Sequence, residues 1–163
     1  AAVSGGHLNC AVSLGFRVTN RMSNNRFIAY CCAQLFGAIL ASFLLKFLLG
    51  SSVVFTTTGT LTATRPMIVF LWEFFGTFAL TYVVFATAVT ENAGTAAPLA
   101  IGLTLAADIF AFGRFTGGSM NPARTLGPAV AFWKFGNAFW YVVAHMIGGA
   151  SAAFVNEKMT EKE

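Results

Sequence analysis

The chain has 163 residues, of which 56% are hydrophobic and 10% charged, with a formal net charge of +4. Soluble domains average about a quarter charged residues, so this composition excludes an ordinary soluble protein and predicts a membrane protein in contact with lipid. The positive charge is modest and dispersed, unlike the basic footprint of a nucleic-acid-binding protein. We therefore expect no nucleic-acid partner.

The first element in chain order is a short polar segment, SGGHLNCAVSLG, at residues 4–15. Asn9 belongs to the residue types that cap helix N-termini, and it predicts a half-length helix over residues 9–18. Gly5 and Gly6 before it predict an irregular backbone. Such backbone is tolerated at membrane depth only where it lines a cavity, so its carbonyl groups are expected to point into one.

Four apolar runs come after this segment, at residues 27–49, 67–89, 97–115 and 138–155. Each is about as long as a helix that crosses a hydrocarbon layer of about 30 Å, so an all-α membrane fold is predicted. Arginines at 17, 21 and 26 precede the first run, which favours the cytosol for that end. Glu73 lies inside the second run, and an intramembrane carboxylate is a candidate functional residue.

A second polar segment, TGGSMNPARTLG at residues 116–127, repeats the first one 112 positions later. Asn121 is again a suitable N-cap, and proline fits the first helical turn that follows it. We therefore predict a second half-length helix over residues 121–131. The identical pairs are Gly5/Gly117, Gly6/Gly118, Asn9/Asn121, Ala11/Ala123, Leu14/Leu126 and Gly15/Gly127.

The positions of the two copies predict an inverted repeat. The second copy follows two apolar runs and precedes one, and units with an odd number of spans insert in opposite orientations. We expect one domain over residues 1–163, with a first repeat reduced to residues 1–50 and a second over residues 66–155. The first two spans of the first repeat are absent; we expect them to exist outside this sequence, the alternative being that a partner fills the gap. The half-helices would then meet by their positive N-terminal ends beside a conduit.

No catalytic or metal-binding constellation is evident. Cys10, Cys31 and Cys32 follow no metal-ligand spacing, and buried inert thiols are expected there. The two histidines and three cysteines form no nucleophile and base pair that sequence can support. We therefore expect that the protein is not an enzyme and that it binds neither a metal nor a cofactor.

The two polar segments resemble the paired Asn-Pro-Ala boxes of the aquaporin, or major intrinsic protein, family. YCCAQLFGA, WEFFGTFALTYVVFA and LAIGLTLA are similar to its helices. The resemblance implies six tilted helices and two half-helices around one pore per subunit, assembled as a homotetramer. It also implies passive passage of water and small neutral solutes, with protons and ions excluded.

The resemblance also implies roles for individual residues. Glu73 would hold the second loop by accepting its backbone N–H groups, and Ile109, Gly118 and Arg124 would form the selectivity filter. The pore centre would comprise Asn9, Cys10, Ala11, Asn121, Pro122 and Ala123. A ladder of carbonyl groups would come from Gly5, Gly6, His7, Gly117, Gly118 and Ser119.

The filter combination is similar to the tonoplast-type branch, some members of which pass ammonia as well as water. This favours an internal membrane over the plasma membrane. A fourth filter residue would lie on an absent helix, so the solute range stays open. Thr125 and Ala129 stand where glycerol facilitators carry an acid and a base, whereas Val142 replaces an aromatic residue of many water channels.

Two departures from the family pattern bear on activity. Cys10 replaces the proline of the first box, which costs about 0.4–1 kcal/mol through unfolded-state entropy; its thiol is expected at the constriction, where mercurials would block flux. His145 replaces a proline of the last helix and is expected to be a packing histidine rather than a proton carrier. The alternative function is a non-conducting, degenerate channel that serves as a structural subunit of a larger membrane assembly.

Overall fold

The computed structural model describes residues 4–50, 65–89 and 95–160, and within these ranges every regular element is helical. This confirms the all-α prediction. Four helices are long and apolar enough to cross a membrane, which confirms the four predicted spans. The elements are α1 (Cys10–Val18), α2 (Asn24–Leu49), α3 (Pro66–Val84), the π-helical turn η2 (Phe85–Val89), α4 (Ala97–Thr116), α5 (Pro122–Ala131) and α6 (Ala138–Thr160).

The two short helices, α1 and α5, begin at asparagine caps. Asn9 Oδ1 accepts a hydrogen bond from Ala11 N at 2.9 Å, and Asn121 Oδ1 accepts one from Ala123 N at 2.9 Å. Such caps satisfy backbone donors that have no partner within the helix. Both short helices therefore start where the sequence predicts.

The repeat extends to the backbone geometry of the two loops that precede α1 and α5. Leu8 has a φ of 53° and its counterpart Met120 one of 51°, in the left-handed region that costs non-glycine residues energy. Gly5 and Gly117, with φ of 76° and 80°, adopt the same region without that cost. The two loops are thus near copies in conformation as well as in sequence.

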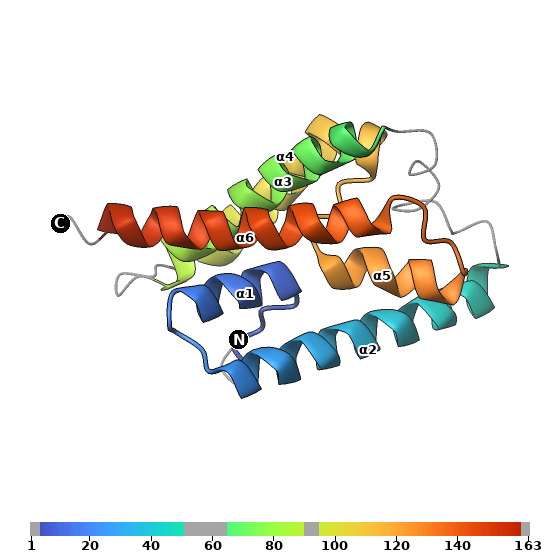
Figure 1. Cartoon of the computed structure of the whole chain (residues 1–163), viewed down its shortest axis with the longest axis horizontal. Helices are drawn as coiled ribbons and strands as arrows, with labels where there is room; N and C mark the ends of the chain where they lie inside the picture. The colour runs from blue at the N-terminus through green and yellow to red at the C-terminus, as the bar shows by residue number, and fades with distance from the viewer. Residues whose placement is uncertain (1–3, 51–64, 90–94, 161–163) are drawn as a thin grey trace.

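Each half-helix packs on a span from the other half of the chain. Helix α1 lies along α6, and α5 lies along α2. Figure 1 shows α1 and α5 roughly in line between α6 and α2, with α3 and α4 behind. This crossed packing fixes the two half-helices relative to one another, because each is held by a span of the opposite half.

Three glycines allow these helices to approach closely. A Cβ added at Gly148 would lie 2.6 Å from Phe74 O, one at Gly149 would lie 2.6 Å from Ala11 O, and one at Gly127 would lie 2.7 Å from Ala38 O. Small residues at helix interfaces permit such backbone approach in membranes. Gly149 in particular sets how closely α6 supports α1.

Replacing Gly149 by alanine is expected to destabilise the fold by about 1–3 kcal/mol, the usual cost of overpacking, because the α1 backbone has to move. Gly102 is the matched control: nothing lies within 4 Å of its added Cβ, so Gly102→Ala should be neutral or stabilising by up to about 1 kcal/mol. Thermal unfolding in detergent compares the two variants. Equal transition temperatures would contradict the close packing of α6 on α1.

Candidate functional site

The two asparagine caps meet at the centre of the molecule. Asn9 Nδ2 donates to Met120 O at 2.7 Å, and Asn121 Nδ2 donates to Leu8 O at 2.8 Å. Each acceptor is the carbonyl group of the residue before the other asparagine. These two bonds join the repeats symmetrically and place the N-terminal ends of α1 and α5 side by side.

A cavity of about 490 Å³ lies at this junction. Its polar residues come from the two loops and half-helices, and they are Gly5, Gly6, His7, Asn9, Ser119, Asn121 and Arg124. The opposite wall is largely apolar and includes Leu80, Val84, Ala88, Val89, Ala97, Ile101 and Leu105. A solute in this cavity would meet these hydrogen-bonding groups, interspersed with Leu8, Val12 and Phe16, along one side and hydrocarbon along the other.

Glu73 holds the second loop. Its Oε1 accepts from Ser119 N at 2.9 Å and its Oε2 from Met120 N at 2.7 Å. Oε2 also lies 2.7 Å from His145 Nε2, and both side chains are fully buried. Because a buried charge is tolerated only when it is well hydrogen-bonded, these partners explain how a carboxylate resides inside a span.

Arg124 lines the cavity and ties down the carbonyl groups before Asn121. It donates through Nη2 to Gly117 O at 3.2 Å and through Nη1 to Gly118 O. Gly118 also contacts Ile109, since an added Cβ would lie 3.2 Å from Ile109 Cγ1. The structure brings these three filter candidates together, with Arg124 alone of the three among the residues that line the cavity.

The first loop is held by side chains of α1 and α2. His7 Nδ1 lies 3.1 Å from Ser13 Oγ, which also accepts from Gln34 Nε2 at 3.1 Å. Burial, and then the positive charge of Arg26, lower the pKa of His7, which lies outside the four spans. A neutral ring at physiological pH follows.

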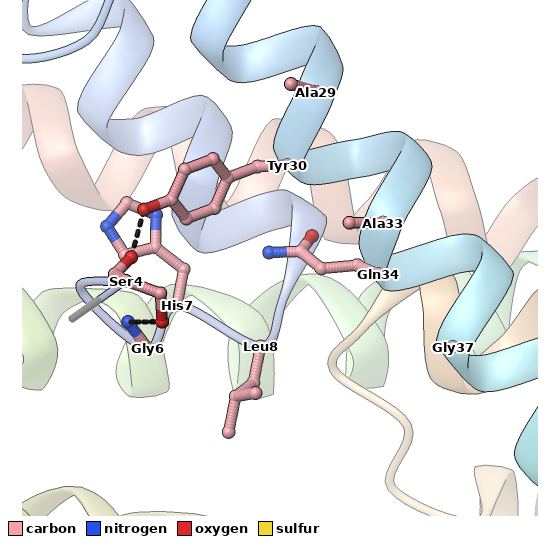
Figure 2. Close-up of a pocket in the computed structure, with 9 residues that line it drawn as sticks. All are labelled: Ser4, Gly6, His7, Leu8, Ala29, Tyr30, Ala33, Gln34 and Gly37. Carbon is pink, nitrogen blue, oxygen red and sulfur yellow. Dashed lines mark hydrogen bonds between the residues drawn. The ribbon is translucent and has the colours of Figure 1, made fainter.

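A second hollow, of about 540 Å³, lies on the outer side of this loop. Figure 2 shows it between the loop and α2, with the Tyr30 hydroxyl donating to Ser4 O and Leu8 pointing away from α2. The α2 side presents small residues, Ala29, Ala33 and Gly37. This hollow contains neither asparagine cap and is therefore not the candidate site.

Cys10 is 3% exposed and is not among the residues that line the cavity. Its thiol lies near the side chain of Cys31 on α2 and near the backbone of Ala123. The thiol therefore lies on the α2 side of α1 and outside the cavity lining, whereas the sequence predicts it at the constriction. The remaining pore-centre candidates outside the cavity lining are Ala11, Pro122 and Ala123.

Sequence reasoning missed the pairing of His145 with Glu73 and the contact of Cys31 with Cys10. It also missed Tyr141, whose hydroxyl donates to Thr116 O at 2.6 Å at the end of α4. The available signal was a pair of ionisable side chains on two apolar spans, since intramembrane polar residues pair with one another. That rule does not identify the partner when several polar groups are present.

The family model and the similar known proteins agree with one another. The family model described as major intrinsic protein matches residues 1–156. A probable aquaporin TIP-type from Medicago truncatula is 43% identical over 160 residues, covering 96% of this chain and 63% of the relative. Aquaporin TIP2-1 from Arabidopsis thaliana is 42% identical over 158 residues, covering 95% and 63%. The chain thus spans less than two thirds of the length of these relatives.

A solved structure has the same fold. The aquaglyceroporin from Plasmodium falciparum superposes with a TM-score of 0.72 at 22% identity, covering 94% of this chain and 72% of that one. At this identity the likeness concerns the fold alone. The aquaporin-like fold that the resemblance implies is therefore confirmed.

Proposed function

The chain belongs to the major intrinsic protein family, and on that premise we propose that it forms a passive transmembrane channel for water and small neutral solutes. The observation that carries the proposal is the pair of crossed hydrogen bonds that sets Asn9 and Asn121 side by side at the cavity. Such a channel has no catalytic step, so the protein is not proposed to be an enzyme.

The asparagine amides supply donors to a passing solute. Each Nδ2 carries two hydrogens, and the bond to the opposite loop uses one of them. The second is available to an oxygen in the cavity. Since the facing wall is apolar, including Leu80, Val84 and Ile101, a water molecule there accepts from the amides and finds few other partners. This arrangement orients water and interrupts a proton-conducting chain.

Cations are repelled by fixed positive charge. A helix N-terminus carries about half an elementary charge, and the ends of α1 and α5 both face the junction. The Arg124 guanidinium adds a full charge on the cavity wall. Neutral solutes are not subject to this electrostatic repulsion, so the pore selects them over cations.

The filter candidates and the relatives support a more specific proposal for the solute and the membrane. Ile109, Gly118 and Arg124 lie together, and the similar relatives carry tonoplast-type names. We propose ammonia as a second solute and an internal, vacuolar-type membrane as the location. We also propose a homotetramer in lipid, with strongly exposed Phe47 and Phe110 at its lipid or subunit contacts.

A non-conducting structural subunit is the second candidate. The observation that favours it is the exposure of the first loop: Leu8, next to Asn9, is 80% exposed in the part of the chain that the structure describes. A conduit open on that side would not separate solute from lipid. In this alternative the protein is part of a larger membrane assembly.

Stopped-flow shrinkage of proteoliposomes distinguishes the two functions. Vesicles would carry either this chain or this chain joined to the segment of a tonoplast-type relative that it does not match. The channel function predicts faster shrinkage than empty vesicles for at least one of these preparations. Empty-vesicle rates from both, with the protein folded and inserted, would favour the structural subunit.

Mercurial reagents are expected to block this flux through Cys10. Its thiol lies near Cys31 and the backbone of Ala123, so a bound mercury atom would displace the N-terminal end of α1. Cys10→Ser should conduct and resist block, whereas Cys32→Ser, which alters an exposed thiol on α2, should stay sensitive. A Cys10→Ser channel with unchanged mercury sensitivity would refute the assignment.

A further inference from the structure

His145 lies within the last span, fully buried, with Nε2 2.7 Å from Glu73 Oε2. Both carboxylate oxygens already accept backbone N–H groups of the second loop, so the carboxylate is in its accepting form and Nε2 is the donor. His145 Nδ1 has no partner among the described residues. A neutral ring with its proton on Nε2 leaves only a lone pair unsatisfied, whereas a protonated ring would bury an unpaired N–H donor.

Further hydrogen bonds lead from Glu73 toward the junction of the two half-helices. Oε2 accepts from Met120 N at 2.7 Å, and Met120 O accepts from Asn9 Nδ2 at 2.7 Å. His145, Glu73, Met120 and Asn9 thus form one chain of hydrogen bonds from α6 to the first repeat. Met120 is fully buried with a φ of 51°, a conformation that persists only where surrounding contacts hold it.

Besides His145, the side chain of Thr116 on α4 lies near the Glu73 carboxylate, whereas the polar neighbours on α3 and α6 bond elsewhere. Tyr141 packs its ring edge-on to the imidazole, with centroids 5.9 Å apart, and its hydroxyl bonds Thr116 O rather than the carboxylate. Thr77 Oγ donates to the Glu73 backbone, not to its side chain. On α6, His145 is therefore the residue that restrains the carboxylate.

We propose that His145 is a positioning residue for the channel centre. Its Nε2–H holds the Glu73 carboxylate in the orientation that grips Met120 N–H, and through Met120 it fixes the acceptor of Asn9. The role rests on the proposed channel function. It differs from simple helix packing because it depends on one donor atom at one place.

Two amide variants separate position from chemistry. Glutamine places its amide nitrogen where histidine has Nε2, whereas asparagine ends about one atom short of it. We expect His145→Gln to retain the water permeability per inserted protein and His145→Asn to lose roughly tenfold, the scale of one hydrogen bond to a charged group. The His145→Leu variant should lose as much water permeability as His145→Asn. Permeabilities of the Asn and Leu variants equal to wild type would overturn the proposal.

A double-mutant cycle tests whether His145 acts through Glu73. In a Glu73→Gln background the loop is already released, so adding His145→Asn should change permeability little. A packing role independent of the carboxylate would instead multiply the two losses. Full multiplication would contradict the proposal.

A spectroscopic readout needs no flux. The chain holds two histidines, so ¹⁵N spectra of histidine-labelled wild type, compared with His145→Gln, identify the His145 ring. We expect a protonated Nε2 and a bare Nδ1. A bare Nε2 would refute the hydrogen bond even in a conducting channel, whereas the expected tautomer in a protein without flux would leave the bond in place and refute the channel function instead.

Discussion

Replacing Arg124 by alanine is expected to admit cations and protons to the conduit while water still passes. The change removes the full positive charge from the cavity wall and releases the Gly117 and Gly118 carbonyl groups from their donors. At about 4–8 Å and an effective dielectric constant of about 20, a unit charge contributes about 2–4 kcal/mol of repulsion to a passing cation. Its loss should raise cation passage by one to three orders of magnitude.

Proton entry into vesicles with a pH-sensitive dye, driven by a potassium diffusion potential, measures this effect. Arg114→Ala is the matched control, because Arg114 is an exposed residue of α4 outside the cavity lining. Arg124→Lys should retain the charge barrier but lose the fork of donors that holds both carbonyl groups. Proton exclusion by Arg124→Ala as complete as in wild type would refute the role of this charge.

Replacing Asn121 by aspartate is expected to reduce water flux and attract cations. Aspartate still caps α5, so the half-helix persists, but the carboxylate cannot donate to Leu8 O as the amide does at 2.8 Å. Loss of one donor costs about 0.5–1.5 kcal/mol, or roughly a twofold to tenfold fall in water permeability. The new negative charge offsets the positive ends of the two half-helices.

Paired water and cation fluxes in one vesicle preparation measure both consequences. Asn25→Asp is the control for charge alone, because Asn25 is exposed in the first turn of α2. Asn9→Asp should behave like Asn121→Asp, since the two asparagines make equivalent bonds. A large difference between these two variants would contradict a symmetric junction.

The sequence predicts those features that depend on local chemistry. Asn9 and Asn121 mark the starts of both half-helices because capping involves residues two positions apart. The four spans follow from apolar length, and the duplicated segments predict matching loops. The start of α2 at Asn24 was three residues earlier than predicted, since Ser23 Oγ caps it by accepting from Arg26 N.

Contacts between distant residues were not predictable in this way. His145 and Glu73 are 72 positions apart, and only the packing of α6 on α3 brings them together. The direction of the Cys10 thiol depends on the placement of α2 beside α1, which no local pattern specifies. The exchange of half-helices between the two halves likewise emerges only from the packed structure.

In the proposed channel, two opposed half-helices let water pass and exclude ions at one junction. The most direct test of this selectivity records osmotic shrinkage and potential-driven proton entry in the same proteoliposomes, relative to empty vesicles. A selective channel should give accelerated shrinkage with proton entry at the empty-vesicle rate, and proton entry should appear when Arg124 is replaced by alanine. Proton entry that rises in proportion to water flux in the wild type would contradict it.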